Sequence, residues 1–285
     1  MTAVLAIAGY GFREALRRKV FAVVVILTAV FLSLLWVACH FAFQHVENMT
    51  PPAGVPVDKR TFAGTFLLGL AVFGTLFLGV VLSIFLTLGV VGGDAERGLL
   101  QPLVVRPVGR ATLLLSRFLG AAAVAVVYVL VVYGIGLTIV DLTGNWLPAH
   151  KLGPAIELAG AVVVVVAVSL LGSVVLSSIA NGIAVFMLFG AGLVAGLLAS
   201  IGHALNSHTI ERISTIAAWA LPFEALYQDT LRLISTDATG LTSFLLELGP
   251  FGGGFVHGWP IRIWAVGYVV VALGVAIAVF SRKDL

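Results

Sequence analysis

The residues best suited to do chemistry or bind a partner lie in one polar segment, 92–110, between two long apolar runs. The segment opens with Asp94 and Glu96, and a helix dipole favours acidic residues in its first turn. Its apolar residues would share one side of a short helix, and cations flank them. The apolar set is Leu99, Leu100, Leu103 and Val104, and the cations are Arg97, Arg106 and Arg110.

Two interpretations of this segment stay open on the residues alone. Apolar side chains ringed by charge are typical of a docking surface for another protein. The same residues could instead join two spans and pack against their own bundle.

Several catalytic motifs are absent from the sequence. It has no Gly-x-x-x-x-Gly-Lys-Ser/Thr phosphate loop, no His-Glu-x-x-His zinc pair and no Gly-x-Ser-x-Gly nucleophile elbow. The apolar runs contain no Asp or Glu, whereas ion-coupled transporters usually keep carboxylates at mid-membrane. We therefore expect no catalytic residue and no cofactor in this chain, and an energy source in another subunit if the chain transports.

Four polar residues elsewhere stand out. Ser169, Ser173 and Ser177 recur every four residues, which predicts a stripe on one helix facing either a translocation path or a partner helix in simple packing. Glu224 follows Pro222 in a polar connection. There it could gate an exit on the outer side or cap a helix N-terminus, and the cap is favoured.

Histidines and cysteine offer little for metal binding. The histidines all fall at or beyond the expected outer edge of the membrane, and Cys39 is the single cysteine. We expect no metal site, although a metal- or haem-dependent membrane enzyme remains an alternative. The histidines are His40, His45, His150, His203, His208 and His257.

Composition indicates the fold class that must position these residues. Of 285 residues, 60% are hydrophobic and 10% are charged, against roughly 45–50% and about 25% in soluble domains. A soluble fold and a disordered chain are both excluded. The net charge of +3 reflects basic residues at the ends of apolar runs, so it indicates membrane topology and no nucleic-acid partner. We expect an all-α integral membrane protein that contacts lipid.

Six uncharged stretches are long enough to cross the bilayer, which takes roughly 20 residues. They are Val20–Phe43, Phe62–Val91, Phe118–Val140, Leu158–Ala180, Ile183–Ile201 and Ile263–Phe280. A turn around Ser178, Asn181 and Gly182 should join the fourth and fifth. With both termini in the cytoplasm, ten of the 16 Lys and Arg residues lie inside and six outside, which agrees with the positive-inside rule.

The remaining segments complete a single permease-like domain over 1–285. Residues 1–19 predict an amphipathic helix lying in the membrane interface, with Arg13, Glu14, Arg17 and Arg18 on its polar side. The outer connection 203–258 is too long for a plain turn. We expect it to form short re-entrant or interfacial helices between the fifth and sixth spans, one of which starts at Pro222.

The inner segment resembles the first cytoplasmic loop of the permease subunits of ABC type-2 exporters. That loop carries two acidic residues, then Gly-Thr-Leu, then Pro-Val-Ser-Arg and leucines. The matching residues are Asp94, Glu96, Gly98, Leu100, Pro107, Val108 and Arg110. The chain departs at Leu99, where Thr is usual, at Ser116-Arg117, where Gly-Lys is usual, and at Pro102 within the presumed helix.

The resemblance implies an ATP-driven exporter in the cell membrane. Two permeases, identical or different, would bind two ABC ATPase subunits, and those subunits would bind ATP and Mg²⁺. The loop would act as a coupling helix in a cleft of the ATPase, with Arg97, Arg106 and Arg110 making polar contacts and Leu99 and Leu103 filling apolar depressions. An accessory or assembly protein that docks an ATPase without transporting is the other alternative.

Overall fold

The computed structural model describes residues 19–46, 58–88, 109–205, 207–238 and 258–282. Every regular element in these ranges is an α-helix. The interfacial helix expected over 1–19 and nearly all of the inner loop 92–110 lie outside the described residues. The expectation of one domain over 1–285 stays a prediction.

Six of the eight described helices are long and apolar enough to cross a membrane. They are α2 (Lys19–Val46), α3 (Lys59–Thr87), α5 (Arg110–Gly144), α6 (Leu152–Val175), α7 (Ser178–Ala204) and α11 (Gly258–Ser281). The expectation of an all-helical membrane protein with six spans is confirmed. Two shorter helices, α8 (His208–Ala220) and α9 (Pro222–Ile234), fall in the connection between the fifth and sixth spans.

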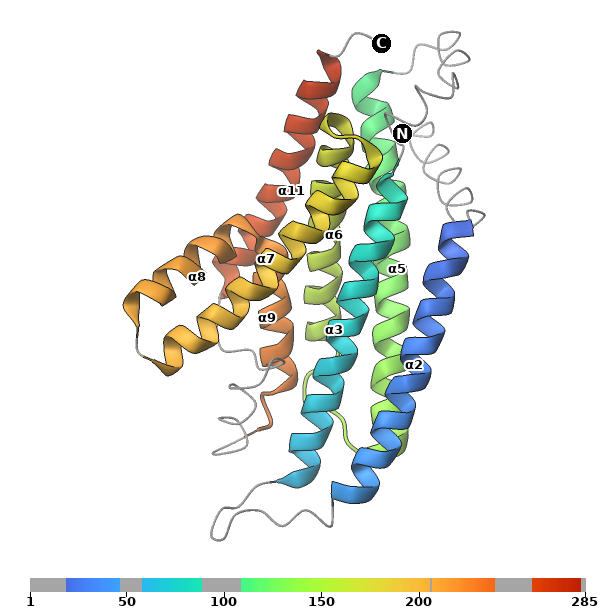
Figure 1. The fold of residues 1–285 in the computed structure, drawn as a ribbon, viewed down its shortest axis with the longest axis vertical. Coiled ribbons are helices and arrows are strands. Elements are labelled where there is room, and N and C mark those ends of the chain that lie inside the picture. The colour runs from blue at the N-terminus through green and yellow to red at the C-terminus, as the bar shows by residue number, and fades with distance from the viewer. Residues whose placement is uncertain (1–18, 47–57, 89–108, 206, 239–257, 283–285) are drawn as a thin grey trace.

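Consecutive long helices run in opposite directions along the bundle, so each connection between them lies at the opposite end from the one before it. Figure 1 shows the start of α2, the end of α3, the start of α5 and the end of α11 at the same end. The inner loop, which joins α3 to α5, therefore leaves and re-enters the bundle beside the two ends of the described chain.

Helices α3 and α6 form the middle of the bundle. In the most apolar 18-residue stretch of α3, 78% of the residues are buried. Helix α6 packs against α3, α5, α7, α9 and α11. Leu68, Leu76, Val129 and Leu158 are each fully buried in this core. By contrast α2 exposes a row of large apolar side chains, among them Ile26. An exposed apolar surface on a long helix is expected where lipid tails replace water.

The turn between the fourth and fifth spans lies earlier than expected. Helix α6 ends at Val175, the break covers Leu176 and Ser177, and α7 begins at Ser178. The cause is a side-chain bond across the break: Asn181 Nδ2 donates to the carbonyl of Ser169 (3.0 Å) and holds Asn181 in the first turn of α7. Asn181 is fully buried there.

Helix α9 is buried on almost all sides although its sequence is amphipathic. It begins with Pro222 at its first position, where the missing N–H costs no hydrogen bond. It packs against α6, α7, α8 and α11. Helix α8 is mostly exposed, and the indole N–H of Trp264 in α11 donates to the carbonyl of Trp219 near its end (2.8 Å). Together the two short helices cover the side of α7 and α11 (Figure 1).

Close packing in the core predicts which glycines tolerate a methyl group. A Cβ at Gly64 in α3 would overlap the ring of Trp146, whereas a Cβ at Gly190 in α7 would meet nothing within 4 Å. We expect Gly64→Ala to destabilise the protein by about 1–3 kcal/mol through overpacking. Gly190→Ala should be neutral or stabilising by up to about 1 kcal/mol through helix propensity.

Thermal unfolding of the two purified variants in one detergent measures the difference. Equal stability of Gly64→Ala and Gly190→Ala would contradict the packing of α3 against Trp146.

Candidate functional site

Arg110 is the one residue of the expected coupling set that the structure describes. It is the first residue of α5, and its Nη1 donates to the carbonyls of Phe280 (3.3 Å) and Ser281 (3.0 Å) at the end of α11. Its guanidinium also lies 6.0 Å from the centroid of the Phe280 ring. A cation at a helix C-terminus is favoured by the helix dipole. The loop therefore ends on a residue that binds the last span, and its contact with a partner stays a prediction.

The other expected coupling residues lie outside the described residues. They are Asp94, Glu96, Arg97, Gly98, Leu99, Leu100, Leu103, Arg106 and Pro107. The same holds for the polar face of the expected interfacial helix, Arg13, Glu14, Arg17 and Arg18. Their roles stay predictions.

The serine stripe contains two residues of α6 rather than three. Ser169 and Ser173 are both buried in α6, but Ser177 lies in the break before α7 and is exposed. The stripe was expected to include Ser177 because the fourth span was expected to run from Leu158 to Ala180. The helix ends at Val175 because Leu176 is extended and Asn181 folds back onto Ser169.

Ser169 joins three helices through hydroxyl and amide groups. Its Oγ lies 2.6 Å from Thr87 Oγ1 at the end of α3, and its carbonyl accepts from Asn181 of α7. Ser173 donates within its own helix to the carbonyl of Leu170 (2.7 Å). A Cβ at Gly172 would overlap Asn181 Oδ1. Both buried serines therefore make contacts that hold helices together or stay within one helix.

A cluster of buried charges joins α6, α9 and α11. Arg262 Nε lies 2.6 Å from Glu157 Oε1, and Arg262 Nη2 lies 3.8 Å from Asp229 Oδ2. The Asp229 side chain is fully buried, that of Glu157 is 9% exposed and that of Arg262 is 28% exposed. The Arg262 guanidinium also lies over the Trp259 ring, 5.3 Å from its centroid. One cation thus bridges two carboxylates from different helices.

Sequence reasoning missed this cluster. Glu157 and Arg262 each stand one residue outside an expected span, and Asp229 falls on the polar side of the re-entrant or interfacial helix that was expected to start at Pro222. Their position in the sequence could have indicated a role, because a charged side chain directly at the end of an apolar run must reach water or a partner. No spacing rule connects residues so far apart in the chain, so their pairing required the structure.

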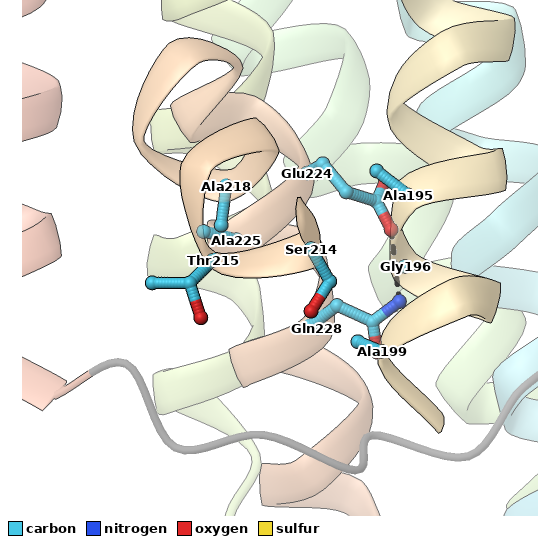
Figure 2. A pocket seen from close by; sticks show the side chains of 9 residues that line it. All are labelled: Ala195, Gly196, Ala199, Ser214, Thr215, Ala218, Glu224, Ala225 and Gln228. Carbon is cyan, nitrogen blue, oxygen red and sulfur yellow. Dashed lines mark hydrogen bonds between the residues drawn. The ribbon is translucent and has the colours of Figure 1, made fainter. Parts of the chain in front are cut away.

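Glu224 lies in the first turn of α9, where an acidic residue was expected to cap the helix. The residue before the helix is Leu221, and Glu224 points toward α7 (Figure 2). Glu224 is 3% exposed. Its Oε1 accepts a hydrogen bond from Gln228 Nε2 (2.8 Å), and its Oε2 is buried with no hydrogen-bond partner among the described residues. Burial raises the pKa of the Glu224 carboxyl to about 8.

No group of three His, Cys, Asp or Glu residues in the described ranges is arranged to hold a metal ion. His40 lies 2.9 Å from Gln44 Nε2, and His45 Nδ1 lies 2.9 Å from the carbonyl of Phe41. His208 lies 3.5 Å from Glu211 in α8. His257 is outside the described residues.

The buried charge cluster predicts a large effect of removing its cation. Arg262→Met keeps most of the side-chain length but removes the guanidinium that pairs with Glu157 and Asp229. Removing one partner of a fully buried pair costs about 3–5 kcal/mol, so we expect about 2–3 kcal/mol for this partly exposed arginine. Arg212→Met on the exposed face of α8 is the matched control.

Unfolding of the two variants by titration with sodium dodecyl sulfate measures the loss. Indistinguishable unfolding curves would show that the cluster does not stabilise the packing of α6 against α9 and α11.

The comparisons with known proteins agree with this architecture. A family model described as "ABC-2 family transporter protein" matches residues 5–285, which is nearly the whole chain and includes the inner loop. A search of curated proteins finds no match. Permeases of this family generally pair with an ABC ATPase subunit. The match along almost the full length, together with six candidate spans, shows that this multi-pass membrane protein belongs to the ABC-2 transporter family as the permease of an ABC transporter.

Proposed function

We propose that the protein forms the translocation path of an ATP-driven exporter and is driven by a separate ATPase through its inner loop. The observation that carries this proposal is the family match, which runs through the inner loop as well as the helices. The absence of a phosphate-binding loop from the sequence supports an external source of energy.

The arrangement of the helices supports a cytoplasmic position for the loop. An even number of spans returns the chain to its starting side, and the loop leaves the bundle at that same end (Figure 1). The excess of basic residues places this end inside the cell. The loop then faces the compartment that contains ATP, and both termini of the protein lie in the cytoplasm.

Arg110 supports a route by which movement of the loop reaches the spans. The loop runs directly into α5, whose first residue is bonded to the end of α11. In the proposed mechanism, closure of the ATPase pair displaces the loop, and α5 and α11 move together because Arg110 joins them. The Ser169 contacts couple α3 to α6 and α7 at the same end of the bundle.

The proposed assembly contains two permease chains and two ATPase subunits in the cell membrane. The ATPase subunits hold ATP and Mg²⁺, and this chain supplies the helices and the docking loop. Spans without charged residues at mid-membrane favour an apolar or amphipathic cargo.

Placing charge on the apolar side of the loop tests the docking role. We expect the double variant Leu99→Asp/Leu103→Asp to lose co-purification of the co-expressed ABC ATPase subunit. Burying each leucine is worth about 1.5–3 kcal/mol, so the two together should weaken the complex more than about a hundredfold. Membrane insertion and detergent-purified yield should not change.

Leu152→Asp is the matched control. Leu152 begins α6 at the opposite end of the bundle and is 78% exposed, so the ATPase should be retained at the wild-type level. Retention of the ATPase by the double loop variant would contradict the docking role of the loop.

A further inference from the structure

A small cavity lies where α7, α8 and α9 meet, and Glu224 is the one titratable residue in its lining. Its volume is about 20 Å³, enough for one group the size of a water molecule. Figure 2 shows the Glu224 carboxyl and the Gln228 amide turned together toward α7. The lining residues that matter here are Gly196, Ser214, Thr215, Ala218, Glu224 and Gln228.

Glycine at position 196 leaves room for the carboxyl. A Cβ at Gly196 would overlap both Glu224 Oε1 and Gln228 Nε2, and a Cβ at the neighbouring Gly192 would come within 2.7 Å of the Phe223 ring. These two glycines, one turn apart in α7, let α9 approach closely and bring Glu224 against the α7 backbone. The carboxyl is therefore held in place by packing.

Most of the polar atoms left over in the cavity are hydrogen-bond acceptors. The hydroxyls of Ser214 and Thr215 each donate to the carbonyl of Glu211, so only their lone pairs remain. Gln228 donates one of its two Nε2 hydrogens to Glu224 Oε1, and Glu224 Oε2 has no hydrogen-bond partner among the described residues. The three lining oxygens of Glu224, Ser214 and Thr215 therefore suit a ligand that donates several hydrogen bonds.

Glu224 has no ion-pair partner among the described residues. Arg212 of α8 is exposed, and Arg262 of α11 pairs with Glu157 and Asp229. The sequence of α7 has no charged residue between 178 and 202. On α8 the neighbouring titratable groups are Glu211 and His208, which pair with each other. On α9 Tyr227 is buried beside Glu224, and burial together with the Glu224 charge raises the pKa of its hydroxyl. Glu224 must therefore hold a proton or receive a cation from a ligand.

We propose that this cavity binds a primary ammonium group through the Glu224 carboxylate. An ammonium group carries three N–H donors and no acceptor, as the lysine side chain does, and this matches the oxygen atoms of Glu224, Ser214 and Thr215. Its size matches a cavity for one water-sized group, whereas a trimethylammonium group would not fit. Below pH 8, binding displaces the proton of the carboxyl to solvent. The ammonium group comes either from an amine-bearing cargo or from a lipid headgroup.

Direct binding to the full-length chain tests this site without any ATPase. The protein is placed in nanodiscs of phosphatidylglycerol, and radiolabelled dodecylamine is the probe, with dodecanol and dodecyltrimethylammonium as matched ligands. An alkylamine stays charged below about pH 10.4, while Glu224 ionises near pH 8. We expect dodecylamine to bind roughly a hundredfold more tightly at pH 9 than at pH 6, because only about 1% of a carboxyl with a pKa of about 8 is ionised at pH 6. Neither matched ligand should show this pH dependence.

Two variants separate the site from adsorption to lipid. Glu224→Gln keeps a hydrogen-bond acceptor for Gln228 but should bind dodecylamine about a hundredfold more weakly at pH 9 and lose the pH dependence. Glu211→Gln on α8 is the matched control and should bind as the wild type does. Equal binding by Glu224→Gln and wild type, or equal binding of dodecyltrimethylammonium by the wild type, would overturn the proposal.

The wild-type comparison of dodecylamine with dodecanol decides the question even if Glu224→Gln fails to fold. The source of the ammonium group is found by adding phosphatidylethanolamine to the nanodiscs. Competition with dodecylamine indicates a lipid headgroup, and no competition indicates an amine-bearing cargo. Because the assay contains no ATPase and no transport step, loss of the proposed export function would leave its result unchanged.

Discussion

Polar groups inside a bundle that faces lipid must find their partners within the protein. At the end of the bundle where α6 and α11 begin, Arg262 satisfies that constraint. One guanidinium group joins Glu157 of α6 to Asp229 of α9. The last span, a central span and the short helix α9 are thereby connected at one point. At the opposite end Arg110 binds the final carbonyls of α11. Helix α11 is thus held by an arginine at each end.

The same constraint decides how much of the fold was predictable from the sequence. The six spans were predictable because an uncharged run of about 20 residues has few alternatives to crossing a bilayer. Their ends were not, because α5 and α6 extend beyond the apolar runs and carry Arg110 and Glu157 into the structure. The pairing of Glu157 with Arg262 was not predictable either, since the partners are joined by the tertiary fold alone.

Some features of the candidate site were likewise predictable from the sequence and others were not. Glu224 was identified as unusual from its place after Pro222, and its position in a first turn was anticipated. Its contact with α7 depends on Gly192 and Gly196 and on the burial of α9, neither of which shows in the α9 pattern. Amphipathic spacing indicated a re-entrant or interfacial helix, and it did not show that the polar side of α9 packs inside the protein through Asp229 and Glu224. The coupling residues were proposed from the inner loop, and their roles rest on the sequence and the family.

We propose that the inner loop faces the cytoplasm, where an ATPase can bind it. Labelling of single cysteines with an impermeant maleimide tests this directly, in a Cys39→Ala background that removes the one native thiol. Glu96→Cys should react in inverted membrane vesicles and stay unlabelled in intact cells. Thr236→Cys, at an exposed position after α9, should react in intact cells. Labelling of Glu96→Cys in intact cells would contradict the account.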